Sequence, residues 1–154
     1  MSKHHRNRNW APAPQPLPED AHVIDNHTHV ASVVPFSQAM SHEAMEKGQG
    51  EVPVYSVDEL LEQAQKVGVE GVIDCGCELP NLMTAIDMAR EHPGTVHAAI
   101  AIHPNEAVLH GHRGAPGPDG LPIKYKPWHD IPFDEAMAEV HRLATTYPNQ
   151  VVAI

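Results

Sequence analysis

Short apolar runs alternate with amphipathic segments along most of this chain of 154 residues. Four apolar runs have the length of β-strands, at residues 21–25, 69–76, 95–104 and 151–154. Apolar side chains at helical spacing predict helices at residues 57–67, 80–91 and 133–146, with a further helix around 37–47. Ser56 and Glu59 form a capping-box pattern at the start of the helix predicted at residues 57–67.

The order of these elements is β-α-β-α-β-α-β, which predicts an α/β fold. Alternating strands and helices are typical of a parallel sheet with right-handed crossovers. The strands are apolar throughout rather than alternating, which favours strands covered on both faces. A (β/α)8 barrel typically needs about 250 residues. We therefore expect an incomplete TIM (β/α)8 barrel with about four βα units and parallel strands.

Two segments fall outside the alternating pattern. Residues 1–20 are rich in proline and basic side chains and predict a disordered, solubilising tail, without the apolar stretch of a secretory signal. Residues 105–132 are rich in glycine and proline and predict an irregular loop insertion. The rest of the chain, within residues 21–154, is expected to form one domain.

Charge and cysteine content narrow the function classes. The formal net charge of -10 argues against a protein that holds nucleic acid by broad phosphate neutralisation. An enzyme that meets phosphates through a bound metal ion is still allowed, because the ion supplies the local positive charge. No apolar stretch approaches the roughly 20 residues of a membrane span, so we expect no membrane partner. Cys75 and Cys77 are too few for a disulfide framework, which predicts reduced thiols and a cytoplasmic protein.

The strongest chemical signal is the segment from Asp25 to His29. Residues i and i+2 of a strand point to the same face, so His27 and His29 are expected to converge on one point. Neutral imidazoles are common metal ligands, and two of them form half of a metal site. Asp25 lies one step back on the same face, where its carboxylate would orient an imidazole. The pair follows an apolar strand, at the end where parallel α/β folds build their sites.

His103 ends the third apolar run and is a second candidate. Parallel strands would bring it to the same rim as the histidine pair, where it would hydrogen-bond a phosphate or a leaving group without binding metal. Glu106 on the same loop is interpreted as a solvated acid rather than as a metal ligand, and His110 as an ordinary loop histidine. Asp74 ends the second apolar run near the rim, with no second feature that assigns it a role.

Three short motifs follow one another along the chain. They are Asp-Asn-His-Thr-His at residues 25–29, Ala-Ile-His-Pro-Asn-Glu-Ala at 101–107 and Val-Val-Ala-Ile at 151–154. In this order and separation they resemble the TatD family of metal-dependent deoxyribonucleases, over residues 21–154. The resemblance implies a TIM barrel that uses one or two divalent metal ions (Mg, Mn or Zn) to hydrolyse phosphodiester bonds in DNA, often from the 3′ end.

Carried over by position, the resemblance implies that His27 and His29 are the first two metal ligands. It also implies that His103 is a histidine of the active-site pocket and that Asp25 is the acid before the pair. In the family, the strand matching residues 151–154 runs into a Gly-Glu motif whose glutamate bridges the metals, and further ligands follow. This sequence ends before that motif. We therefore expect the N-terminal half of a TatD-like barrel, a truncated fragment without nuclease activity of its own.

Two other interpretations stay open. A phosphoesterase of the polymerase-and-histidinol-phosphatase (PHP) type, or another amidohydrolase-like enzyme, also opens with an Asp-x-His-x-His strand, although the motif around His103 favours the TatD family. The third interpretation is a non-catalytic fragment or assembly module. A half-barrel exposes its outer strands, and exposed strand edges promote self-association. For the enzyme, the expected partner is DNA or a small phosphoester bound through the metal site.

Overall fold

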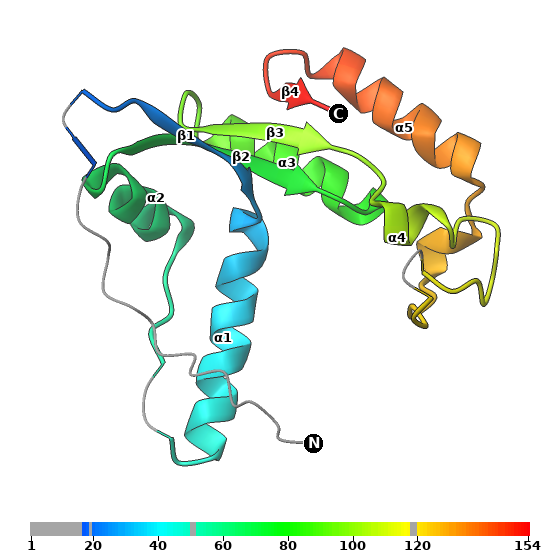
Figure 1. The fold of residues 1–154 in the computed structure, drawn as a ribbon, viewed down its shortest axis with the longest axis horizontal. Helices are drawn as coiled ribbons and strands as arrows, with labels where there is room; N and C mark the ends of the chain where they lie inside the picture. Colours follow the sequence, from blue (N-terminus) through cyan, green and yellow to red (C-terminus); the bar gives the residue numbers. More distant parts are fainter. Residues whose placement is uncertain (1–16, 19, 50–51, 118–119) are drawn as a thin grey trace.

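The computed structural model describes residues 17–18, 20–49, 52–117 and 120–154. Its strands are β1 (Val23–Thr28), β2 (Val69–Gly76), β3 (Val96–Ile100) and β4 (Val151–Ala153). They form one parallel sheet in the order β1-β2-β3-β4 (Figure 1). The predicted α/β fold with parallel strands is confirmed. The prediction of a disordered tail falls mainly on residues 1–16 and 19, which lie outside the described residues.

Helices connect the strands and cover the sheet. They are α1 (Val30–Glu46), α2 (Val57–Lys66), α3 (Leu79–Glu91), α4 (Pro104–Ala107), α5 (Phe133–Thr146) and a 3-10 helix, η1 (Pro127–Asp130). Helix α3 packs on β2 and β3, α2 packs on β2, and α5 packs against α3 (Figure 1). The predicted helices that correspond to α2, α3 and α5 are confirmed to within a residue at each end.

Helix α2 follows directly from its local sequence. The hydroxyl of Ser56 accepts a hydrogen bond from the backbone N–H of Glu59 at 3.2 Å, and the Glu59 carboxylate accepts one from the backbone N–H of Ser56 at 2.8 Å. This capping box satisfies two N–H groups that the first turn leaves without helical partners. Just after the other end of the helix, Gly68 adopts a φ of 93°. Residues with a side chain rarely adopt this backbone conformation, so glycine is favoured there.

Helix α1 is longer than predicted. It begins at Val30 rather than near residue 37, and it contains Pro35. The buried carboxylate of Asp74 accepts a hydrogen bond from the backbone N–H of Val30 at 2.6 Å, so a residue far along the chain caps the helix. Beyond this cap, α1 extends away from the sheet (Figure 1). In the described part of the chain, neither α1 nor any other helix is long and apolar enough to cross a membrane.

The helices pack on one face of the sheet. In β3, Val96, Ala98 and Ile100 are buried, whereas His97 and Ala99 between them are half-exposed. The buried side chains join α3 and α5 in the core. The prediction of strands covered on both faces is therefore wrong for the described residues, because the helices that pack on β2 and β3 leave the opposite side chains accessible.

Strand β1 is irregular between Asp25 and Thr28, the stretch that contains His27. Asp25 pairs with Val72, whereas Thr28 pairs with Asp74, so three steps along β1 correspond to two steps along β2. An extra residue of this kind makes a β-bulge, which changes the direction of the side chains that follow it. Strict alternation therefore does not carry from Asp25 through to His29.

The segment expected to be an irregular loop contains defined structure where it is described. It begins within α4, includes an isolated antiparallel bridge between Pro116 and Pro122, and ends just after η1. The backbone N–H of Gly111 donates to the carbonyl of His129 at 2.9 Å and joins the two halves of the segment. Between α4 and η1, the other described residues are turns and irregular backbone. The structure therefore adds local order at the two ends and across the middle of the segment, and the loop insertion stays a prediction.

Gly76 is where β2 approaches α3 most closely. A Cβ at this position would lie 2.7 Å from the carbonyl oxygen of Asn81 and 3.0 Å from the Cα of Leu82. Both are backbone atoms, so Gly76→Ala would force α3 away from β2. We expect the free energy of unfolding to fall by about 1–3 kcal/mol, measured by urea denaturation. Gly71→Ala in the same strand is the control, because its Cβ would meet backbone only at 3.3 Å. Equal losses in the two variants would contradict this account.

Candidate functional site

The end of β2 holds two of the predicted site residues in place. The ring Nδ1 of His29 lies 3.0 Å from the carbonyl oxygen of Cys75, and the backbone N–H of His103 donates to the carbonyl of Cys77 at 2.9 Å. Residues i and i+2 of an extended chain are about 7 Å apart. His29, which follows β1, and His103, which lies beyond the end of β3, are therefore anchored to neighbouring points at the carboxyl edge of the sheet.

The hydrogen bond of His29 fixes which ring nitrogen is available. A carbonyl oxygen only accepts hydrogen bonds, so Nδ1 of His29 carries the proton and donates to Cys75. In the neutral ring, Nε2 then keeps its lone pair, which is the form that binds a metal. The ring of His27 lies beside it, with centroids 5.3 Å apart and an edge-on arrangement. The two imidazoles therefore lie close together, as predicted, although His29 follows β1 rather than belonging to the strand.

Asp25 lies next to this pair but contacts its backbone. The carboxylate accepts a hydrogen bond from the backbone N–H of His27 at 3.1 Å. This bond shapes the chain across the irregular part of β1 rather than holding an imidazole ring. The expected orientation of a ring by Asp25 stays a prediction.

His103 has the opposite ring arrangement to His29. Its Nδ1 accepts a hydrogen bond from the backbone N–H of Asn105 at 3.1 Å. The proton of the neutral ring therefore sits on Nε2, which becomes a hydrogen-bond donor. His103 is exposed at the start of α4, so this donor is accessible. A donor of this kind suits a phosphate oxygen and does not suit a metal ion.

A cavity of about 430 Å³ opens beside His29, between the first turns of α1 and α3. Its walls include Asp74, Cys75, Cys77 and Glu78. Burial raises the pKa of both cysteine thiols, and both cysteines are free. The two thiols therefore favour their protonated form.

Asp74 forms part of the cavity wall, and the sequence alone gave it no role. Its side chain is 2% exposed and caps α1 immediately after His29. Burial raises the pKa of this carboxyl group, and hydrogen bonds from the backbone of Val30 and Ala31 partly oppose the shift. Asp74 thus fixes the direction in which the chain leaves the histidine pair.

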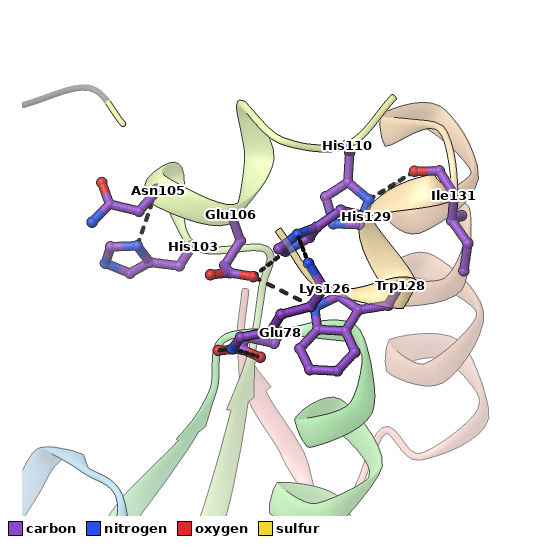
Figure 2. A network of polar contacts seen from close by, with 9 residues as sticks. All are labelled: Glu78, His103, Asn105, Glu106, His110, Lys126, Trp128, His129 and Ile131. Atoms are coloured by element: carbon purple, nitrogen blue, oxygen red, sulfur yellow. Dashed lines mark hydrogen bonds and ion pairs between the residues drawn. The ribbon is translucent and has the colours of Figure 1, made fainter. Parts of the chain in front are cut away.

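Glu106 and His110 differ most from their sequence interpretation. Glu106 is 8% exposed, and its carboxylate lies 2.5 Å from Nε2 of His129 (Figure 2). His110 is 1% exposed, with its Nδ1 2.8 Å from the carbonyl oxygen of Ile131. The interpretation of Glu106 as a solvated acid is wrong, because its partner comes from a distant turn. Nothing in the local sequence marks His129 as that partner.

The histidine pair fits part of a divalent metal site. His29 offers a lone pair at Nε2, and His27 lies beside it. Across the residues that the structure describes, no group of three or more His, Cys, Asp or Glu side chains is placed to hold an ion. Catalytic zinc sites use about three protein ligands, so the pair supplies two and the described residues bring no third.

These features define an α/β protein with histidines gathered at the carboxyl edge of a parallel sheet. Residues 24–154 match the family model for TatD related DNase, and the chain belongs to this family of hydrolases. TIM barrels are the fold of the family, and parallel strands alternating with helices are consistent with part of one. The resemblance inferred from the three motifs is confirmed. No curated protein and no solved structure gave a significant match.

The raised pKa of Asp74 makes stability depend on pH. A carboxyl group whose pKa is higher in the folded chain favours folding fully below its unfolded pKa of about 4, and this contribution is lost as the pH rises through the folded value. Asp74→Asn keeps an acceptor for the α1 cap and removes the charge. We expect Asp74→Asn to gain stability relative to the wild type as the pH rises from 4 to 8 in urea denaturation.

Asp74→Ala separates the cap from the charge. It removes the acceptor as well, so it should be less stable than Asp74→Asn by about 1 kcal/mol, the usual worth of an N-cap hydrogen bond. An Asp74→Asn variant that becomes progressively less stable than the wild type at higher pH would show that the pKa assignment is wrong.

Proposed function

We propose that this protein is a metal-dependent hydrolase of phosphodiester bonds, with DNA as its substrate class. The observation that carries the proposal is the ring arrangement of His29, which keeps Nε2 free beside His27 at the carboxyl edge of the sheet. Membership of a DNase family supports the reaction and the polymer. A small phosphoester is the alternative substrate for the same site.

Each predicted site residue has a distinct task in this proposal. The proposed site holds one or two divalent ions, and His27 and His29 would bind one of them. Imidazole ligands favour Zn²⁺ over Mg²⁺. When bound, the ion supplies an activated water and positive charge for the phosphate. His103 donates from Nε2 to a phosphate oxygen or to the leaving group. Asp25 keeps the backbone at His27 in place through its 3.1 Å hydrogen bond.

The negative net charge of the chain favours a mechanism in which the bound metal ion, rather than the protein surface, attracts the phosphate of the substrate. With a formal net charge of -10, the protein as a whole repels a polyanion. A metal at the histidine pair creates a local positive centre in this field. Substrate affinity is therefore expected to depend on metal concentration as well as on ionic strength.

Metal binding is the direct test of the histidine pair. We expect Zn²⁺ and Mn²⁺ to bind residues 1–154 weakly by isothermal titration calorimetry, because the described residues provide two ligands. His27→Ala and His29→Ala should each weaken this binding about tenfold or more, since each removes one of the two ligands. His22→Ala is the control, because His22 is exposed and pairs with Glu70 instead. Unchanged affinity in both site variants would refute the proposed metal pair.

Nuclease activity is tested on the same variants. A labelled oligonucleotide is incubated with residues 1–154 at several concentrations of Mg²⁺, Mn²⁺ and Zn²⁺. Because the described residues bring together only two metal ligands, any release of nucleotides should require added metal and should be lost in His27→Ala. Activity that survives chelation or both histidine variants would exclude the proposal.

Exposed apolar side chains on the sheet favour an assembly module as the second candidate. Ile24 on β1 is 57% exposed and Val152 on β4 is 52% exposed. Strand edges with such side chains tend to pair with other chains. Light scattering decides between the candidates: a stable oligomer that Ile24→Lys dissociates, without any metal-dependent hydrolysis, would favour the module.

A further inference from the structure

A buried polar pair joins the turn that carries His103 to the segment around η1. Glu106 comes from α4, and His129 comes from η1; they are 8% and 0% exposed. Nε2 of His129 lies 2.5 Å from Oε2 of Glu106. Nε1 of Trp128 lies 3.5 Å from the same carboxylate oxygen. Figure 2 shows Glu106 directed from its turn toward His129. A buried carboxylate needs such a partner, because burial without one is costly.

The hydrogen bonds of His129 fix its ring as well. Its Nδ1 accepts from the backbone N–H of Lys126 at 2.9 Å, so the proton of the neutral ring sits on Nε2. That N–H points at the Glu106 carboxylate and donates to it. Hydrogen bonds to charged acceptors are roughly twice as strong as neutral ones. Both ring nitrogens of His129 are thus occupied, which holds its ring in one orientation.

Lys126 connects the segment around η1 to the loop that follows β2. Its ammonium group lies 2.9 Å from each carboxylate oxygen of Glu78, the residue just before α3. It also lies 4.8 Å from the centre of the Trp128 ring. The segment around η1 therefore contacts both the loop after β2, through Glu78, and the loop after β3, through Glu106 (Figure 2). Glu78 also lines the cavity beside His29.

The turn that holds His103 is too short to be stable alone. Helix α4 has four residues, and an isolated helix of this length does not form in water. His103 begins the turn, and Glu106 occupies its third helical position. The backbone N–H of Glu106 donates to the carbonyl of His103 at 2.8 Å. Holding Glu106 in the interior therefore holds the backbone from which the His103 ring projects.

We propose that Glu106 and His129 are positioning residues for His103: their buried contact keeps the α4 turn closed, so that His103 presents Nε2–H to the substrate phosphate. The inference rests on the proposed function for the identity of that acceptor. The closed turn itself, and the hydrogen bond from Asn105 to His103, are measurable without catalysis. The segment around η1 is then a support for the site rather than a dispensable insertion.

Two substitutions of His129 separate positioning from mere packing. The amide of a Gln reaches about as far as Nε2 of His and is able to donate to Glu106. The amide of an Asn reaches only as far as Nδ1. His129→Asn therefore keeps an acceptor for Lys126 and loses the contact with Glu106. His112→Phe is the control, since His112 is an exposed histidine of the same loop.

The readout is NMR spectroscopy of the ring of His103 and of the amide of Asn105. In the wild type and in His129→Gln, we expect the ring proton on Nε2 and a protected Asn105 amide. In His129→Asn, the Asn105 amide should exchange about tenfold faster, as for a locally opened turn, while amides of β2 and β3 keep their protection. The ring nitrogen signals of His103 should then average between its two tautomers.

Equal exchange at Asn105 in the Gln and Asn variants, with both folded, would overturn the proposal. So would a wild-type His103 ring that is protonated on Nδ1. If His129→Asn does not fold, Glu106→Gln tests the other partner, because it keeps an acceptor but loses the charge. The exchange rate of the Asn105 amide should then rise about threefold, and an unchanged rate would contradict the proposal.

In an active chain, His129→Asn should lower kcat with little change in KM. Failure of nuclease activity in every form, with the NMR result as expected, would refute only the proposed function.

Discussion

The last residues of β2, together with Cys77 directly after it, provide the contacts on which the candidate site depends. The backbone carbonyls of Cys75 and Cys77 accept hydrogen bonds from His29 and His103, and the Asp74 side chain caps the helix that follows His29. Because β2 lies between β1 and β3, one strand end fixes the residues that leave both neighbours. Parallel pairing places all three ends at the same edge, which is why open α/β sheets carry their ligands there.

Backbone partners give the two histidines different chemistry. His29 faces a carbonyl and must donate from Nδ1, whereas His103 faces an N–H and must accept at Nδ1. One ring is left with a free lone pair and the other with a free N–H. The same residue type is thus suited to bind a metal at one position and to bind an oxyanion at the other. The hydrogen-bond geometry decides both assignments.

Some of the site follows from local patterns and some does not. The spacing of His27 and His29 predicted that their rings approach, and the position of His103 after an apolar run predicted the strand end that it follows. The bulge in β1 was not predictable from alternation, because it depends on how β1 pairs with β2. The burial of Glu106 was also missed, because its partner His129 lies 23 residues away and comes from a segment rich in turn-forming residues.

The sequence by itself determined the order of strands and helices, the parallel α/β class, the capping box of α2 and the identity of the family. These depend on short-range periodicity and on motifs, which are properties of neighbouring residues. Only the tertiary structure decided the start of α1, the covered face of the sheet, the ring tautomers and the Glu106–His129 contact. Each of these requires a hydrogen bond or a packing contact between distant segments, and such pairings are specified by the folded backbone rather than by local sequence.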